Sequence, residues 1–295
     1  MKLPTTDKMK VRIFPECNYK AIHLNGKTVR IALNPEKPIE DLLYPEFYDV
    51  KVTSRCDGAC PYCYQSSGNG IPNQQGIVER FNEFFSKFDK NQVPFQIAFG
   101  GGEPTSHPEF LKLLEACCNL GITPNYTTNG MWISKPNSND ILSKTVECCG
   151  GVAVSTHPHL NYYWREAVNR YLEAGVHTNL HVIIGDTNSI DRFCEIYQEF
   201  TGKIKYFVLL PLSAQGRSTE SFSDWDYLSL KISGSPRDVA FGANFHPYLS
   251  RDRDRFSVSI YDPESMSAYL DLETMKVFKS SFSNELRVIG ENNEK

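Results

Sequence analysis

The 295-residue sequence lacks the features that mark membrane proteins, secreted proteins and nucleic-acid-binding proteins. No apolar run approaches the roughly 20 residues that cross a bilayer, and the first residues, MKLPTTDKMKVRIF, contain no apolar signal-peptide core. The 31 basic and 35 acidic side chains nearly balance, at a formal net charge of -4, which gives no electrostatic reason to expect nucleic acid as a partner. We therefore expect a cytoplasmic protein without a membrane partner.

The cysteines do not form the pattern of an extracellular disulfide framework. There are nine, an odd number, and they include two adjacent pairs and one tight triplet, with none after Cys194. Disulfide frameworks use even numbers of cysteines at spaced positions, in oxidising compartments. The triplet therefore predicts a metal site in a reducing compartment.

Short apolar runs recur along the middle of the chain, each followed by a polar or glycine-rich turn. Five of the six are then followed by a helical pattern, and this alternation predicts an α/β fold with a parallel sheet and right-handed crossovers. Six units are too few to close a TIM barrel, so we expect a partial (β/α)6 TIM-type barrel whose site lies at the carboxyl ends of the strands. The six expected strands span 47–53, 94–100, 122–128, 150–156, 176–186 and 204–210.

The segments on either side of this region divide the chain into three expected domains. Residues 1–46 contain an Asn25-Gly26 pair between apolar runs, which predicts a β-hairpin extension. Residues 47–217 form the expected barrel core. Residues 218–295 are polar and loop-rich and form an α+β extension, with further strands expected within 255–283 and frayed residues at GENNEK.

The cysteine triplet directly follows the first expected barrel strand. Cys56, Cys60 and Cys63 are spaced C-x3-C-x2-C, one thiolate short of the four that close a structural zinc or iron–sulfur site. Three thiolates can hold three irons of a [4Fe–4S] cluster and leave the fourth iron open. The alternative is a zinc site that His107 or His157 completes.

A glycine turn follows the second expected strand. Gly101, Gly102, Glu103 and Pro104 read GGEP; the glycines let the backbone approach a ligand, and the carboxylate can accept hydrogen bonds from an ammonium group. Such a turn alone is weakly specific. Its position one strand after the cysteine loop favours the iron–sulfur interpretation over zinc.

From about Val52 to Arg217 the sequence resembles the radical S-adenosylmethionine (SAM) superfamily. The resemblance rests on the cysteine triplet with Tyr62 before its last member, and on GGEP in the expected place. It implies a [4Fe–4S] cluster whose open iron binds SAM, and reductive cleavage of SAM to a 5′-deoxyadenosyl radical that abstracts hydrogen from a substrate. It also implies a reductant partner such as flavodoxin or ferredoxin.

The resemblance also implies roles for particular residues. Cys56, Cys60 and Cys63 are the expected catalytic and metal-binding residues, and Arg217 is expected to meet the SAM carboxylate. His181 could equally be a satisfied core histidine, while Tyr64, His157 and His159 are further candidates at the rim. The expected cofactor-binding residues are Tyr62, Gly101, Gly102, Glu103, Pro104, Thr128, Asn129, Ser155, Asn179, His181, Leu212 and Arg217.

The tail resembles a SPASM or twitch-type extension that has lost its cluster cysteines. Asn244 and the run Ser280-Ser281-Phe282 stand where cysteines would be expected. We therefore expect a substrate lid or binding wall without an auxiliary cluster. The cysteines outside the triplet are expected to be structural, with Cys17 the one candidate for an exposed thiol.

Three functions fit these patterns. The first is a radical SAM enzyme that acts on a peptide or protein side chain. The tail supports it, and so does the N-terminal hairpin, whose edge could pair with a peptide strand. The second is a radical SAM enzyme for a small molecule or nucleotide, favoured by the short chain and the missing cysteines. The third is a non-catalytic iron–sulfur or zinc-binding module.

Overall fold

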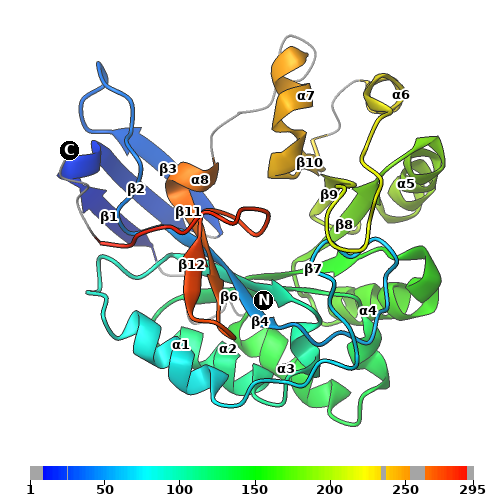
Figure 1. Ribbon diagram of the computed structural model, residues 1–295, viewed down its shortest axis with the longest axis horizontal. Helices are drawn as coiled ribbons and strands as arrows, with labels where there is room; N and C mark the ends of the chain where they lie inside the picture. The colour runs from blue at the N-terminus through cyan, green and yellow to red at the C-terminus, as the bar shows by residue number, and fades with distance from the viewer. Residues whose placement is uncertain (1–8, 25, 234–236, 253–262, 291–295) are drawn as a thin grey trace.

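The six strands expected from the sequence form the centre of one mixed sheet (Figure 1). The computed structural model describes residues 9–24, 26–233, 237–252 and 263–290. The central strands are parallel and lie side by side in chain order, as βα alternation requires. They are β4 (Phe47–Thr53), β5 (Gln96–Gly101), β6 (Thr123–Thr128), β7 (Gly151–Ser155), β8 (Thr178–Ile184) and β9 (Tyr206–Pro211).

Five helices connect these strands and cover one face of the sheet (Figure 1). Gly121 and Gly175 follow two of them at φ of +70° and +73°, the left-handed conformation that ends a helix. The first of them begins at Ile77, directly after Gly76, which adopts φ +72°. The helices are α1 (Ile77–Phe85), α2 (Phe110–Asn119), α3 (Ser138–Cys148), α4 (Asn161–Glu173) and α5 (Thr187–Phe200).

The tail adds strands to both edges of this sheet. β10 (Val239–Phe241) pairs parallel with β9, and β11 (Ser267–Asp271) pairs parallel with β4 at the opposite edge. β12 (Lys276–Phe278) then pairs antiparallel with β11. The sheet thus has nine strands with ends at β10 and β12, which confirms an open, partial barrel. The domain boundaries stay a prediction, and the strands expected within 255–262 lie outside the described residues.

Short helices accompany the tail strands. They are α6 (Trp225–Lys231), α7 (His246–Arg251) and α8 (Pro263–Met266). Trp225 of α6 stacks on Tyr248 of α7 at a ring distance of 5.5 Å, beside Phe222 and Phe245. This aromatic cluster fixes the segment between β9 and β10 against the barrel.

The N-terminal segment forms a separate antiparallel sheet. The expected hairpin is present as β2 (Tyr19–Leu24) and β3 (Lys27–Ala32), with Leu24 opposite Lys27 and Gly26 at φ +68°. The structure adds a third strand, β1 (Lys10–Phe14), paired with β2. Asn25 lies outside the described residues.

Side-chain alternation on β4 separates the helix-packed core from the lumen of the barrel. Tyr48, Val50 and Val52 are almost completely buried against the helices. Asp49 and Lys51 point to the opposite face, because successive side chains of a strand alternate. No helix in the described part of the chain is long and apolar enough to cross a membrane.

Candidate active site

A cavity of about 440 Å³ lies on the lumen face of the sheet. Segments far apart in the sequence form its wall, including the cysteine loop, the ends of five barrel strands and two parts of the tail. Nine of the twelve expected cofactor-binding residues line it, together with all three cysteines of the triplet. Those nine are Tyr62, Gly101, Gly102, Glu103, Thr128, Asn129, Ser155, His181 and Leu212.

Arg217 holds the cysteine loop instead of lining the cavity, so its expected contact with a SAM carboxylate is not supported. Its Nε donates to the Cys60 carbonyl at 2.9 Å and its Nη1 to the Ser67 carbonyl at 2.7 Å. Its backbone N–H donates to the Cys63 carbonyl at 3.0 Å. These bonds connect the loop after β9 to the loop after β4, so the Arg217 guanidinium stabilises the conformation of the cysteine loop.

Burial desolvates the thiols of Cys56 and Cys60, and the Cys56 sulfur accepts hydrogen bonds from the protein. Burial raises the pKa of Cys56 to about 11 and that of Cys60 to about 12, so both are protonated at neutral pH until a metal displaces the proton. The Cys56 sulfur accepts the backbone N–H of Gly58 at 3.4 Å and the Asn129 side-chain amide at 3.7 Å. Such donors stabilise a metal-bound thiolate.

The donor set fits a multi-iron group better than one zinc ion. In the described ranges, no three His, Cys, Asp or Glu side chains are grouped as ligands of a single metal ion. The ring nitrogens of His107 are both engaged, with the Gln74 carbonyl at 2.8 Å and the Glu109 N–H at 3.1 Å. His157 is engaged at Nδ1 by the Tyr62 hydroxyl at 3.1 Å.

Gly101 and Gly102 are required because the turn packs on the backbone that leads into the cysteine loop. Gly101 has φ +105°, and a Cβ there would lie 2.6 Å from the Thr53 carbonyl oxygen. A Cβ on Gly102 would lie 2.1 Å from the Arg55 carbonyl oxygen, well inside contact distance. The turn donates to the same two carbonyls from the backbone N–H of Gly102 and Glu103, at 2.6 and 2.8 Å. The glycines therefore serve this close approach as well as the cavity wall.

The Glu103 carboxylate is mainly engaged within the protein. Its side chain is 1% exposed. One oxygen accepts hydrogen bonds from Thr105 N and Oγ1 at 3.3 and 2.6 Å and from Thr128 Oγ1 at 2.9 Å. The other accepts the backbone N–H of Asn129 at 2.7 Å. Glu103 thus holds Asn129, whose amide reaches the Cys56 sulfur.

Two other expected cofactor-binding residues do not line the cavity. Pro104 is buried and begins a short 3-10 helix, Pro104–Ser106. Asn179 lies on the same face of β8 as His181, two residues nearer the start of the strand, and its buried Oδ1 has no hydrogen-bond partner among the described residues. His181 remains at the wall, where burial lowers its pKa to about 4 and keeps it neutral.

The rim candidates form one aromatic group beside the cysteine loop. The rings of Tyr62 and His157 lie 5.7 Å apart, and His159 Nε2 hydrogen-bonds with the Gly58 carbonyl at 2.7 Å. Burial, and then the neighbouring His159, lower the pKa of His157 to about 4. Cys17, the one candidate for an exposed thiol, is 3% exposed, and its sulfur donates to the Asp41 carbonyl at 3.4 Å, which agrees with the structural role that was favoured for it.

The tail closes one side of the cavity, as a lid or binding wall would. Phe282 stacks on Tyr64 of the cysteine loop at a ring distance of 4.5 Å. Asn244 and Ser280, which stand where cysteines were expected, line the cavity with it, and so does Ser281.

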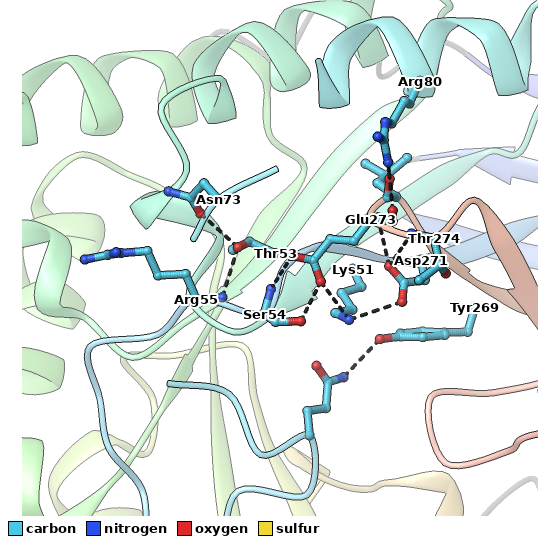
Figure 2. A network of polar contacts seen from close by, with 12 residues as sticks. Lys51, Thr53, Ser54, Arg55, Asn73, Arg80, Tyr269, Asp271, Glu273 and Thr274 are labelled. Carbon is cyan, nitrogen blue, oxygen red and sulfur yellow. Dashed lines mark hydrogen bonds and ion pairs between the residues drawn. The ribbon is translucent and has the colours of Figure 1, made fainter. Parts of the chain in front are cut away.

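A polar network anchors this wall to β4 (Figure 2). Lys51 Nζ lies 3.1 Å from Asp271 and 2.9 Å from Glu273, in the turn after β11. Glu273 also accepts the backbone N–H of Ser54 at 3.0 Å, and its carbonyl accepts Arg80 Nη1 at 2.7 Å. These contacts join the end of β4 to the tail.

The cavity residues that were not expected from the sequence include Asp49, Gln65 and Tyr269. Asp49 carried a signal, since it is an acidic residue at a lumen-facing position of an apolar strand. Gln65 and Tyr269 carried none, because only the pairing of β11 with β4 brings them together.

Comparison of the sequence with known proteins shows the family to which the chain is related. The sequence profile of the Radical SAM superfamily matches residues 50–200. Mycofactocin maturase MftC of Mycobacterium ulcerans is 30% identical over 84 residues, which are 28% of this chain and 22% of that protein. PqqA peptide cyclase of Rhizobium meliloti is 25% identical over 100 residues, 34% of this chain and 26% of that protein.

Solved structures share the fold. Streptococcus suis SuiB, bound to its precursor peptide SuiA, has a TM-score of 0.64 at 15% identity, covering 84% of this chain and 62% of SuiB. AnSMEcpe with bound AdoMet and a peptide has a TM-score of 0.55 at 16% identity, covering 81% and 75%. The chain thus covers under two thirds of SuiB, and its matches to the curated relatives span about a quarter of their length. The family uses a [4Fe–4S] cluster and SAM, and this chain, matched over half its length, belongs to the radical SAM superfamily.

Proposed function

We propose that this chain is a radical SAM enzyme that modifies a side chain of a peptide or protein. The observation that carries the proposal is the position of the three thiols of the triplet at the wall of a cavity that the glycine turn and the tail also line. The names of the relatives, a maturase and a peptide cyclase, support a peptide substrate.

In this proposal Cys56, Cys60 and Cys63 bind the cluster, and SAM occupies the adjoining part of the cavity. When both are bound, the cluster and SAM supply a carbon-centred radical, generated by reduction, that abstracts hydrogen. The protein residues orient these groups: Asn129 and the Gly58 N–H hydrogen-bond to one thiolate, and Glu103 fixes Asn129. The neutral His157 and His181 add no positive charge beside the cationic sulfonium.

The tail wall excludes water from the reacting centre, which protects a radical from side reactions. Its Phe282–Tyr64 stack and its anchor at Lys51 hold it over the cavity. The electron must come from a partner, for which we propose a flavodoxin or ferredoxin. A cytoplasmic location, where such partners occur, remains a prediction from the cysteine pattern.

Anaerobic reconstitution with iron and sulfide tests the proposal. We expect a [4Fe–4S] electron paramagnetic resonance signal that changes on addition of SAM, and release of 5′-deoxyadenosine when a reductant is added. Cys60→Ala should keep the fold, by circular dichroism, and lose both the cluster and the product. Cys194→Ala, a change outside the triplet on α5, is the matched control and should retain both. A colourless protein that binds one zinc per chain would refute the proposal.

A further inference from the structure

One corner of the cavity contains hydrogen-bond acceptors that no donor of the protein satisfies. Asp49 lies on the lumen face of β4, between Tyr269 of β11 and Ala98 of β5 in the sheet register. In the described part of the chain, its carboxylate has no hydrogen-bond or ion-pair partner. The side chain is exposed at the cavity wall, and desolvation by the surrounding protein raises its pKa to about 7.

Gln65 contributes a second unsatisfied acceptor to the same corner. Its Nε2 donates to the hydroxyls of Tyr64 at 2.9 Å and Tyr269 at 3.1 Å, while its buried Oε1 has no partner among the described residues. Both tyrosines lie close enough to Asp49 for its charge to contribute to raising their pKa values, after burial itself. Tyr64, Gln65, Tyr269 and Asp49 therefore form one group, which we call the acceptor corner.

The charges around the acceptor corner do not compensate Asp49. Lys51 is two residues farther along the same face of β4, but its ammonium is shared between Asp271 and Glu273, so this trio carries one net negative charge. The neutral His181 supplies no cation from the opposite wall. The corner is thus negative as well as rich in acceptors.

The remaining ionisable groups of the wall are engaged elsewhere. Lys279 forms an ion pair with Glu285, and Glu103 is hydrogen-bonded to its own loop. The protonated thiols and Tyr62 add no positive charge. A carboxylate at a cavity wall that has a raised pKa and no partner among the described residues is typical of functional sites.

We propose that the acceptor corner is a substrate subsite for a protonated nitrogen, an amine or guanidinium, which on the proposed function belongs to the peptide side chain presented to the cavity. Such a group supplies the N–H donors that Asp49 and Gln65 Oε1 lack and neutralises the carboxylate. The rings of Tyr64, Phe282 and Tyr269 provide apolar and π surface for its methylene stem.

The corner is separate from the expected cofactor residues. Asp49 precedes the end of β4 by four residues, so it lies on the order of 13 Å below the rim where the cysteine loop begins. Apart from Tyr62, the expected SAM contacts lie along β5 to β9 and in the loops after them, whereas the corner is formed by β4, β11 and the end of the cysteine loop at Tyr64 and Gln65.

Binding of small probes to the cluster-loaded protein tests this without turnover. n-Butylammonium and n-butylguanidinium are compared with n-butanol by ligand-observed nuclear magnetic resonance, with and without SAM. We expect the cations to bind at least about tenfold more tightly than the alcohol, about 1.4 kcal/mol. Their affinity should rise as the pH increases through about 7, where Asp49 ionises.

Asp49→Asn keeps the shape and removes the charge, and should abolish both the cation preference and its pH dependence. Asp140→Asn, the same change at an exposed position of α3, is the control and should alter neither. Equal binding of cation and alcohol to the wild type, or no saturable cation binding, overturns the proposal even if Asp49→Asn fails to fold. Competition by SAM would assign the corner to the cofactor and also overturn it. Release of 5′-deoxyadenosine is measured separately, so failure of the subsite is distinguishable from failure of the proposed function.

Discussion

Glu103→Ala should lower the free energy of unfolding by much more than the loss of one surface contact would. The carboxylate accepts four hydrogen bonds, from Thr105 N and Oγ1, Thr128 Oγ1 and Asn129 N, and it is 1% exposed. A buried donor left without its partner costs about 1–3 kcal/mol, but the two hydroxyls can rotate toward other acceptors. The two backbone N–H groups cannot, so we expect a loss of about 3–4 kcal/mol in the free energy of unfolding.

Urea unfolding of the reduced, cluster-free protein measures this loss. Glu109→Ala is the matched control, because that half-buried carboxylate accepts the Ile77 N–H at 2.8 Å. We expect the control to lose about 1 kcal/mol. The Glu103 variant should also lose SAM affinity once reconstituted, since Asn129 is released from its position. If Glu103→Ala is no more destabilised than Glu109→Ala, our assignment of Glu103 as the connector between the two turns is wrong.

Two further changes test the anchoring and the charge state of the site. Lys51→Met leaves Asp271 and Glu273 without their cation, so the free energy of unfolding, measured in urea, should fall by about 3 kcal/mol. The tail should also become more susceptible to limited proteolysis. An unchanged digestion pattern would contradict the conclusion that Lys51 anchors the tail to β4. Because burial lowers the pKa values of His157 and His181 to about 4, the unfolded state binds more protons between pH 4 and 6.5. Stability should therefore fall as the pH decreases through this range, and it should fall less in the double variant with Gln at both positions.

The central architecture could be predicted because it is encoded locally. Alternating apolar residues and left-handed glycines such as Gly121 and Gly175 define strands and helix ends within a few residues. The cysteine loop was visible for the same reason, since Cys56, Cys60 and Cys63 lie within eight residues. For the tail strands, local patterns gave no pairing partner, and so their places at opposite edges of the sheet were not predicted.

The misassigned residues show where such local inference ends. Arg217 was expected to face the cavity, but its donors reach carbonyls 150 and 157 residues earlier in the chain. Asn179 was expected at the rim, but it lies within β8, two residues before His181, and is not among the residues that line the cavity.

The sequence by itself determined the six βα units, the thiol triplet and the glycine turn, because each depends on contacts between near neighbours in the chain. Only the tertiary structure decided which carboxylates are satisfied. Glu103 is saturated by the loops around it, whereas Asp49, equally acidic in the sequence, faces a cavity without a donor. The physical reason is that desolvation and hydrogen-bond satisfaction depend on groups that meet only when distant segments pack together.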